Sequence, residues 1–298
     1  MIAGFVQLYA IVCRKSSAFF HKMQPLCHKC AIFLAQITQA RKTLIGYEGQ
    51  VALNGCQSGV GVMLAVKTFV RAILVVTAGC AGLPSWGQTT STQGVLVELF
   101  TSQGCSSCPP ADAVLQQLTQ VDGVIPLSLH VDYWDYIGWS DTFAQEKFSK
   151  RQRRYAAAVS DRMVYTPQMI VAGDARVKGY DSGEVRAEIA AARALVDLQL
   201  VRQGDDVVIS AQPKTAMLGE FVVDIVRYRP QSVVSIARGE NQGQQIAYHN
   251  IVTEWENLGQ WSGQEALSLR ARATGPAPVV VIIQRKGPRD VVAAAVLK

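Results

Sequence analysis

Two cysteines, Cys105 and Cys108, are separated by two serines in the segment CSSC. Such a pair can form a structural disulfide, can bind a soft metal ion through its thiolates, or can exchange electrons with other thiols. A disulfide with this spacing closes a small ring and restrains little of the unfolded chain. The spacing therefore favours a redox pair over an inert disulfide, and it leaves metal binding open.

The residues that follow Cys108 predict that the pair lies at the amino-terminal end of a helix. Pro109 and Pro110 suit the first helical turn, where a missing N–H group has no partner to lose. Asp112 adds a negative charge that favours the same turn. The partial positive charge of a helix N-terminus stabilises a thiolate and lowers the pKa of a cysteine. This position therefore predicts a reactive thiol.

The elements around the pair alternate between strand and helix. Runs rich in β-forming residues predict strands, and apolar residues at helical spacing predict helices. The expected order is a strand at 95–100, the cysteine loop and its helix, a strand at 124–131, a helix from Asp141 or Thr142, a strand–turn–strand segment within 164–180, and a helix after the capping pair Asp181 and Glu184.

The pattern changes near Leu198. From there to the last residue, strand-like runs are separated by turn residues, and no helical pattern competes with them. This pattern predicts an all-β unit, either an antiparallel sandwich or a sheet. Within it, the segment 237–255 gathers Glu240, Asn241 and His249 around glycines, and we expect an interdomain contact or a ligand loop there.

Two longer segments carry a resemblance to known proteins. The motif CSSC after VLVELF, with the later segment YTPQMIVAGD, resembles the redox motif and the proline loop of the thioredoxin superfamily. The combination of ELFTSQGCSSCPPAD with HVDYWDYIGWSD is similar to a family of bacterial exported thioredoxin-like proteins of uncharacterised function, over most of residues 94–298. The resemblance implies an α/β fold class: a thioredoxin-like domain with a helical insertion at 92–197, followed by a mostly antiparallel, sandwich-like β-rich domain at 198–298.

The resemblance also implies roles for individual residues. Cys105 would be the nucleophile, and Cys108 would be the resolving thiol that releases a mixed disulfide. Pro167 would form a cis peptide bond facing the pair, and Thr166 would offer backbone groups to a bound polypeptide. Serines stand between the cysteines instead of the Gly-Pro of thioredoxins, and Gly104 stands where those proteins have a tryptophan. These departures leave the redox potential and the choice of partner open.

Glu98 is the acid that the resemblance selects. Thioredoxins bury an acid on the strand before their motif, where it helps to move the proton of the resolving cysteine, and Glu98 lies on the corresponding strand. A buried carboxyl group has a raised pKa, which suits that task. The alternative is a Glu98 side chain that faces solvent.

An aromatic and acidic loop follows the second expected strand, at 132–139. Trp134 in this loop could wall a groove for a peptide or another ligand, and we assign it to substrate binding together with Thr166. The alternative is a hydrophobic plug that joins the following helix to the core.

His130 supports a metal-binding alternative. It ends the strand beside the cysteines, and two thiolates with one imidazole suit copper, so the ligands would be Cys105, Cys108 and His130. In the thioredoxin superfamily the proline loop usually blocks metal access to the pair. We therefore expect a site without metal, and thiol–disulfide exchange needs no cofactor.

Charge is distributed unevenly along the 298 residues. The formal net charge is +6, but residues 1–87 contain eight of the 29 basic and one of the 23 acidic residues, which leaves 21 basic against 22 acidic residues in the rest. This nearly neutral body lacks the concentrated basic surface that nucleic-acid binding requires.

Residues 63–87 have the features of a signal peptide. Two basic residues precede a short apolar stretch at 72–83, and the small residues Ser85 and Gly87 suit cleavage before Gln88. The alternatives are a lipid anchor at Cys80 and an uncleaved membrane anchor.

Residues 1–62 are expected to be a spurious extension from an upstream start codon, or a disordered one. Export would take the protein to the periplasm or out of a bacterial cell, with no stable membrane span after cleavage. In that oxidising environment, Cys105 and Cys108 would be the two cysteines left to form a disulfide.

Together these features predict an exported thiol–disulfide oxidoreductase that acts on a protein or a small-thiol partner. The glycine-rich phosphate loop, the Gly-x-Ser-x-Gly elbow and the zinc-protease helix motif do not occur in the sequence. The alternatives are a periplasmic copper-binding protein and a non-catalytic module that binds another polypeptide.

Overall fold

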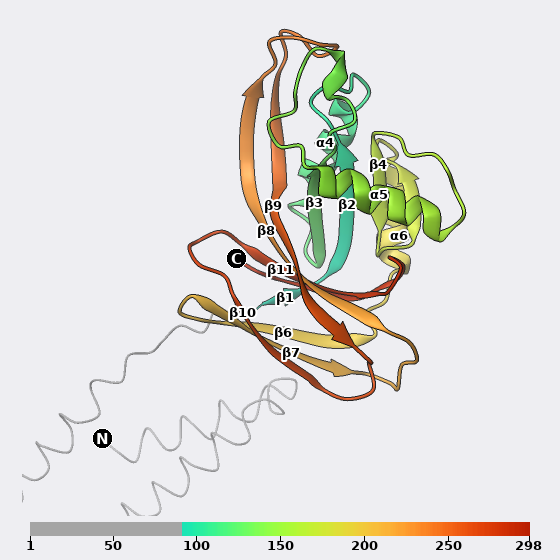
Figure 1. Ribbon diagram of the computed structural model, residues 1–298, viewed down its shortest axis with the longest axis vertical. Coiled ribbons are helices and arrows are strands. Elements are labelled where there is room, and N and C mark those ends of the chain that lie inside the picture. Colours follow the sequence, from blue (N-terminus) through green and yellow to red (C-terminus); the bar gives the residue numbers. More distant parts are fainter. Residues whose placement is uncertain (1–90) are drawn as a thin grey trace, which may run out of the picture. The chain divides into compact units, whose positions relative to one another are not determined.

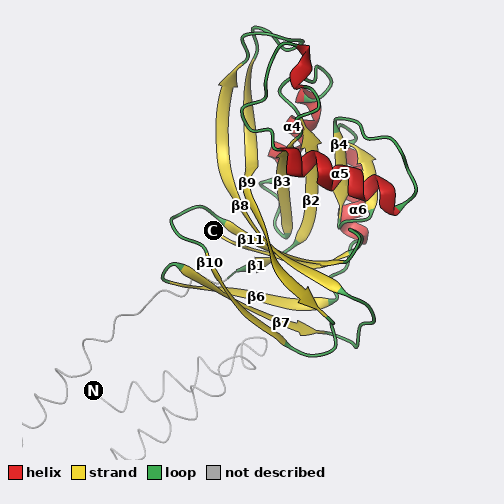
Figure 2. Ribbon diagram, viewed as in Figure 1, coloured by secondary structure: helices red, strands yellow, loops and turns green. Residues whose placement is uncertain are grey.

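Strands form most of the regular structure in residues 91–298, the part of the chain that this computed structural model describes (Figures 1 and 2). In chain order the elements are β1 (Thr92–Gln93), β2 (Val95–Thr101), α4 (Pro109–Leu118), β3 (Val124–His130), the short 3-10 helix η1 (Asp135–Ile137), α5 (Glu146–Ala158), β4 (Gln168–Val171), β5 (Ala175–Lys178), α6 (Ser182–Ala191), β6 (Val196–Gln203), β7 (Asp206–Pro213), β8 (Phe221–Ser235), β9 (Gln245–Trp261), β10 (Leu267–Arg272), β11 (Val279–Arg285) and β12 (Val291–Leu297).

The strands of residues 91–298 form two sheets. The larger sheet has nine strands in the order β1-β12-β11-β8-β9-β3-β2-β4-β5, and the smaller has the order β10-β7-β6. In the larger sheet β3 is parallel to both β2 and β9, and the other neighbours are antiparallel. The result is one mixed sheet that contains strands from both halves of the described chain.

The expected fold class, a thioredoxin-like α/β domain followed by a separate β-rich domain, is wrong. β3 pairs with β9 through Ser128 and Ile251, so the later strands β8, β9, β11 and β12 continue the sheet that contains β2 and β3. In Figure 1 the long strands β8 and β9 run alongside β3. The sequence pattern identified strands, but it holds no information on which strands pair across such long separations.

The length of β8 explains part of this error. A proline usually interrupts a strand, but β8 is continuous from Phe221 to Ser235 across Pro230. β11 pairs only with residues 221–227 of β8, so beyond them β9 is the strand that pairs with β8. An edge position tolerates a proline, because the missing N–H group has no strand partner to lose. The β8–β9 hairpin can therefore extend far beyond β11.

Alternation along β2 gives the larger sheet two distinct faces. Val97 and Leu99 pack in a cluster with the residues of α4, whereas Leu96 and Phe100 pack in a cluster with Tyr155 of α5. Successive side chains of a strand point to opposite faces, so odd-numbered residues of β2 face α4 and even-numbered residues face α5. Figure 2 shows α5 crossing β2 and β3.

The smaller sheet covers another part of the larger one. Its apolar residues, including Leu198, Leu200 and Ile209, share a buried cluster with Phe221 and Val281 of the larger sheet. This core lies at the end of the β8–β9 hairpin that is opposite its tip, and it anchors the hairpin.

The expected extension at 1–62, the signal peptide at 63–87 and the alternative lipid anchor at Cys80 lie outside the described residues. Within residues 91–298, each helix is too short or too polar to cross a bilayer.

Candidate functional site

Cys105 and Cys108 are joined by a disulfide in the loop between β2 and α4. The S–S distance is 2.13 Å and the Cα atoms are 5.4 Å apart. Cys108 is the N-cap residue of α4, and its carbonyl oxygen accepts from the N–H groups of Ala111 at 2.9 Å and Asp112 at 3.1 Å. The pair thus lies at the amino end of a helix, as the two prolines predict.

The disulfide is buried, but it lies close to exposed residues. Both cysteines have an exposed fraction of 0%, while Ser106 and Ser107 between them are exposed. The Sγ atom of Cys105 lies 3.4 Å from the Oγ atom of Ser107. The Cys105 sulfur is therefore in contact with an exposed side chain.

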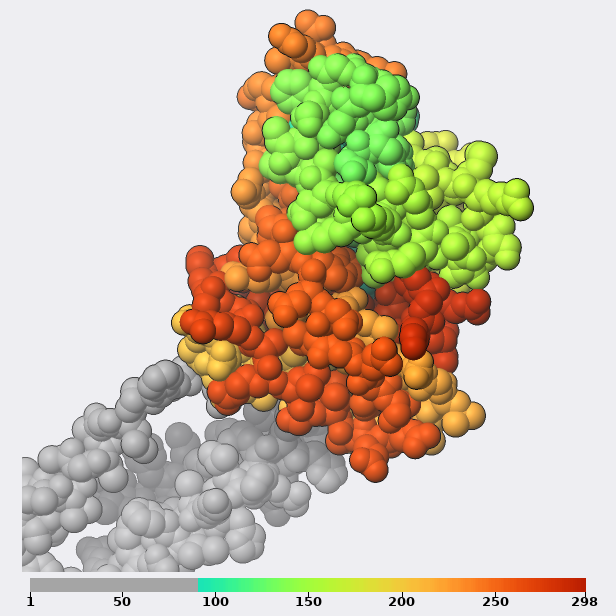
Figure 3. Space-filling view, in the orientation of Figure 1, coloured from blue at the N-terminus to red at the C-terminus, as the bar shows by residue number. Residues whose placement is uncertain are grey.

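The tip of the β8–β9 hairpin, residues 236–244, provides much of the cover of this disulfide. The side-chain amide of Asn241 donates to the carbonyl oxygens of Gln103 and Cys105, at 2.9 Å each. Glu240 Oε2 accepts from the Ser106 hydroxyl at 2.6 Å and from the Ser106 N–H at 3.2 Å. Figure 3 shows the tip at the upper end of the molecule. The segment that sequence reasoning expected to be an interdomain contact or a ligand loop thus lies against the cysteine loop.

Pro167 lies beside the first turn of α4. The Thr166–Pro167 peptide bond is cis. A Cβ atom added to Gly179 would lie 3.0 Å from the Cβ of Pro167 and 2.8 Å from the Cβ of Ala111. Only a glycine allows Pro167 and the helix to approach each other this closely. The structure therefore places Pro167 close to the helix that carries the cysteines.

Trp134 connects Thr166 to the cysteine loop. Its indole Nε1 donates to the Thr166 hydroxyl at 2.7 Å. Its Cβ would lie 3.3 Å from a Cβ added to Gly104, the residue before Cys105. The absence of a side chain at residue 104 thus leaves room for Trp134. The structure brings both residues assigned to substrate binding to the rim of the cysteine loop.

Glu98 is not near the cysteines. It is fully buried on the α5 face of the sheet, where its Oε1 lies 2.6 Å from Nε of Arg151. Its Oε2 accepts from Nη2 of Arg151 at 3.1 Å and from the Tyr155 hydroxyl at 2.5 Å. Arg151 also stacks 4.0 Å from the ring of Trp255. Glu98 is therefore the centre of a satisfied ion-pair network, on the opposite face from α4.

A different acid, Asp112, lies under α4. It is 5% exposed, and its Oδ2 accepts from the hydroxyl of Thr101 at 3.2 Å. Burial raises the pKa of Asp112 from its ordinary value of 3.8 to about 7, against smaller lowering effects of His130 and of the Thr101 hydrogen bond. The sequence predicts for Asp112 only a favourable negative charge in the first turn of the helix. Its spacing of four residues from Cys108 was the signal that could have identified it.

His130 lies in the same region, and one of its ring nitrogens is engaged. Nδ1 is 2.7 Å from Oδ2 of Asp141, which also accepts from the N–H of Gln103 at 2.7 Å. The rings of Phe143 and Tyr248 pack edge-on against His130. In residues 91–298, no group of three or more His, Cys, Asp or Glu side chains is arranged to hold a metal ion.

Asp141 also explains why α5 starts later than expected. Its Oδ1 accepts from the N–H of Phe143 at 2.8 Å, and its carbonyl oxygen accepts from Ala144. These bonds form a turn, and α5 begins only at Glu146. The acid that was expected at a helix start instead links His130 to the cysteine loop.

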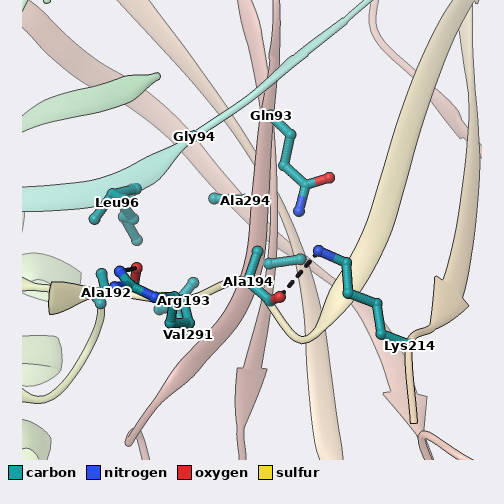
Figure 4. A pocket seen from close by; sticks show the side chains of 12 residues that line it. Gln93, Gly94, Leu96, Ala192, Arg193, Ala194, Lys214, Val291 and Ala294 are labelled. Carbon is teal, nitrogen blue, oxygen red and sulfur yellow. Dashed lines mark hydrogen bonds between the residues drawn. The ribbon is translucent and has the colours of Figure 1, made fainter. Parts of the chain in front are cut away.

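Two pockets in residues 91–298 lie away from the disulfide. One of about 290 Å³, shown in Figure 4, lies between β1, β12 and the end of α6, where Lys214 Nζ donates to the carbonyl oxygen of Ala194 at 3.1 Å. Another, of about 410 Å³, is lined by Arg151, Trp255 and the segment around Lys286. Neither pocket is lined by a cysteine.

These features define a mostly β protein with a Cys-x-x-Cys disulfide at the start of a helix. The chain belongs to the family described as "Protein of unknown function (DUF1223)", whose profile matches residues 96–284. A crystal structure of protein AGR_C_4864 from Agrobacterium tumefaciens is similar, with 32% sequence identity and a TM-score of 0.60, over 68% of this chain and 93% of that chain. No curated protein matches the chain.

Proposed function

We propose that this protein is a thiol–disulfide oxidoreductase whose Cys105–Cys108 pair alternates between disulfide and dithiol. The observation that carries the proposal is the position of the disulfide at the amino end of α4, beneath exposed serines. A disulfide in this position adds little to the stability of the fold, because its ring is small. The resemblance to the thioredoxin superfamily implies this chemistry. We propose the chemistry for the cysteine pair alone, because the fold is not that of a thioredoxin-like domain.

Helix α4 favours the reactive form of the reduced pair. It has ten residues, begins with two prolines, and its partial positive charge lies at Cys108. A thiolate is stabilised at such a position, and the thiolate is the attacking species in exchange. We assign Cys105 as the nucleophile, because its Sγ atom contacts the exposed Ser107.

The substrate would bind where Trp134, Thr166 and Pro167 border the cysteine loop. Trp134 and Thr166 are both partly buried, and they already share a hydrogen bond. A polypeptide or small thiol bound here would lie against Gly104 and Cys105. We propose that this exchange takes place in the periplasm or outside a bacterial cell, where disulfides persist.

Exchange requires the hairpin tip to move from the cysteine loop. Its hydrogen bonds to the cysteine loop come from Asn241, which donates to two carbonyl oxygens, and from Glu240, which accepts from Ser106. Net hydrogen-bond contributions of about 0.5–1.5 kcal/mol each can be exchanged for bonds to water at small cost. These hydrogen bonds can therefore open to admit a partner.

The zero exposure of both cysteines favours a second candidate, a non-catalytic module that binds a polypeptide through the same rim. In that case the disulfide would be a permanent part of the loop. The two candidates differ in whether the pair exchanges electrons in the folded protein.

Titration of the protein with a graded thiol–disulfide buffer, followed by thiol labelling, distinguishes them. We expect one reversible two-electron couple, and we expect Cys108→Ser to accumulate mixed disulfides on Cys105 while the matched variant Cys105→Ser does not. A pair that stays oxidised until the protein unfolds would contradict the oxidoreductase and would support the binding module.

A further inference from the structure

The α4 face of the larger sheet carries a group of buried polar residues beneath the cysteine pair. Thr101 ends β2 on this face, and its register partner His130 ends the parallel strand β3. Ser128 lies two residues before His130 and so points to the same side. Thr101, Ser128 and His130 are 0–1% exposed. This polar group under α4 is unusual, because the other side chains that pack against α4 on this face form an apolar cluster.

Three polar atoms of this region have no hydrogen-bond partner within residues 91–298. They are Oδ1 of Asp112, Oγ of Ser128 and Nε2 of His130. Buried polar atoms are normally paired, and those that are not often belong to groups that take part in chemistry. The same region therefore holds a carboxyl group with a free oxygen and two other unpaired polar groups.

Asp112 and Cys108 lie on one side of α4. Cys108 has helical backbone angles, and the N–H of Asp112 donates to its carbonyl oxygen at 3.1 Å, so the helical spacing of four residues holds between them. Side chains four residues apart in a helix are neighbours, with Cβ atoms roughly 5–6 Å apart. Both residues are buried, so neither side chain faces solvent, and Asp112 contacts Thr101 of the polar group.

We propose that Asp112 accepts the proton of the Cys108 thiol when the reduced pair closes to the disulfide. This assignment rests on the proposed oxidoreductase function. It replaces the predicted role of Glu98 in moving this proton, because Glu98 is held by Arg151 on the other face of the sheet.

The surroundings of Asp112 suit proton transfer near neutral pH. Burial raises its pKa to about 7, so both of its protonation states are accessible there. The charged or titratable groups that face it are His130 from β3, Asp141 from the following loop and Tyr248 from β9. Thr101 from β2 contributes a neutral hydrogen bond to Oδ2, which leaves Oδ1 free.

The steps can be written with all atoms and electrons accounted for. The Cys105 thiolate attacks a partner disulfide, which forms a mixed disulfide and releases one partner thiolate. The Cys108 thiol then gives its proton to the Asp112 carboxylate, and its sulfur attacks the Cys105 sulfur. The Cys105–Cys108 bond forms, the second partner thiolate leaves, and it receives the proton from Asp112. The partner disulfide gains two electrons and the cysteine pair loses two; oxidation of a partner dithiol follows the same steps in reverse.

The reaction of the reduced protein with dithiobis(nitrobenzoate), an aromatic disulfide with a coloured thiolate product, tests this assignment. The attack of Cys105 releases the first coloured thiolate, and closure by Cys108 releases the second. We expect the rate of the second phase in the wild-type protein to rise with pH through an inflection near 7. In Asp112→Asn we expect that inflection to disappear and the second phase at pH 7.5 to slow about 100-fold, as is typical when a general base is removed. Asp122→Asn, at an exposed acid just after α4, is the matched control and should behave as wild type.

A second variant guards against a folding defect in Asp112→Asn. Thr101→Val keeps the carboxyl group but removes a hydrogen bond that lowers the pKa of Asp112. The inflection of the second phase should therefore move to higher pH, with the first phase unchanged. A merely structural role for Asp112 would not shift this inflection.

The outcomes separate the two proposals. If neither phase occurs with the folded protein, the oxidoreductase function is wrong. If both phases occur but the second has the same pH profile in wild type, Asp112→Asn and Thr101→Val, the function stands and the assignment of Asp112 is overturned.

Discussion

Two buried carboxyl groups, Glu98 and Asp112, lie on opposite faces of the same sheet and have opposite surroundings. Glu98 is paired with Arg151 and accepts from Tyr155, so its charge is fully compensated. Asp112 has one hydrogen bond from Thr101 and a free oxygen. Burial alone therefore does not identify a reactive acid. The partners of each carboxyl group make the difference. Glu98 is compensated by Arg151 and stabilises the fold, whereas Asp112 has no cation partner and can take up and release a proton.

The largest effect is expected on the Glu98 side. Arg151→Met would leave the Glu98 carboxylate buried without a cation, and breaking a buried pair costs about 3–5 kcal/mol. Urea unfolding should show that loss, whereas Arg154→Met, at an exposed residue of the same helix, should change little. A loss under 1 kcal/mol for Arg151→Met would mean that Glu98 is not held as a charged group, and the contrast with Asp112 would fail.

The second effect concerns stability and pH on the Asp112 side. The pKa of Asp112 is raised from 3.8 to about 7, so between these values the folded state binds a proton that the unfolded state has lost. Wild-type stability should therefore fall as pH rises from 4 to 7, by about 1.4 kcal/mol per unit of pKa shift. Asp112→Asn should lack this decrease, and become more stable relative to wild type by a few kcal/mol at pH 8 compared with pH 4.

Unfolding free energies at several pH values would check this, with Asp122→Asn as the control that keeps the wild-type slope. Equal slopes for wild type and Asp112→Asn would show that Asp112 is ionised in the folded protein below pH 7.

A smaller effect is expected at the cover of the disulfide. Asn241→Ala removes two hydrogen bonds that hold the hairpin tip on the cysteine loop. At about 0.5–1.5 kcal/mol per bond, the disulfide should be reduced by dithiothreitol roughly tenfold faster. Gln242→Ala, at the exposed neighbouring residue, serves as the control. An unchanged rate for Asn241→Ala would show that the tip does not limit access.

The smallest effect is expected for Glu240→Gln. Glu240 is an exposed acceptor for Ser106, and contacts between solvent-exposed groups contribute little to stability. We expect a change in the reduction rate of less than about fivefold, measured in the same assay. A larger effect than that of Asn241→Ala would assign the main contact of the tip to Glu240.

The sequence predicted the local elements near the cysteines better than it predicted the fold. Pro109 and Pro110 placed the pair at a helix start, and β2 and β3 lie where β-forming runs predicted strands. These predictions succeed because they depend on neighbouring residues. The fold class failed because the contact of Ser128 with Ile251 joins residues far apart in the chain, and no local pattern records it.

The same limit applies to the site. The aromatic loop predicts Trp134 and the thioredoxin resemblance predicts Thr166; the two lie together, and their role as binding residues stays a prediction. Glu98 was chosen because it precedes the cysteines on a strand. The parity of that strand shows why this choice fails geometrically: even-numbered residues of β2 point to α5. Asp112 follows the cysteines, and only the helical spacing from Cys108 connects it to them.

The alternation of β2 has a consequence for how this family can diverge. A single-residue insertion or deletion between Glu98 and Thr101 would put these two residues on the same face of the strand, because side chains repeat every second residue. Either Glu98 would point away from Arg151, or Thr101 would point away from Asp112. Related chains can therefore vary freely in surface loops, but we expect the length of this short stretch to be the same in all of them.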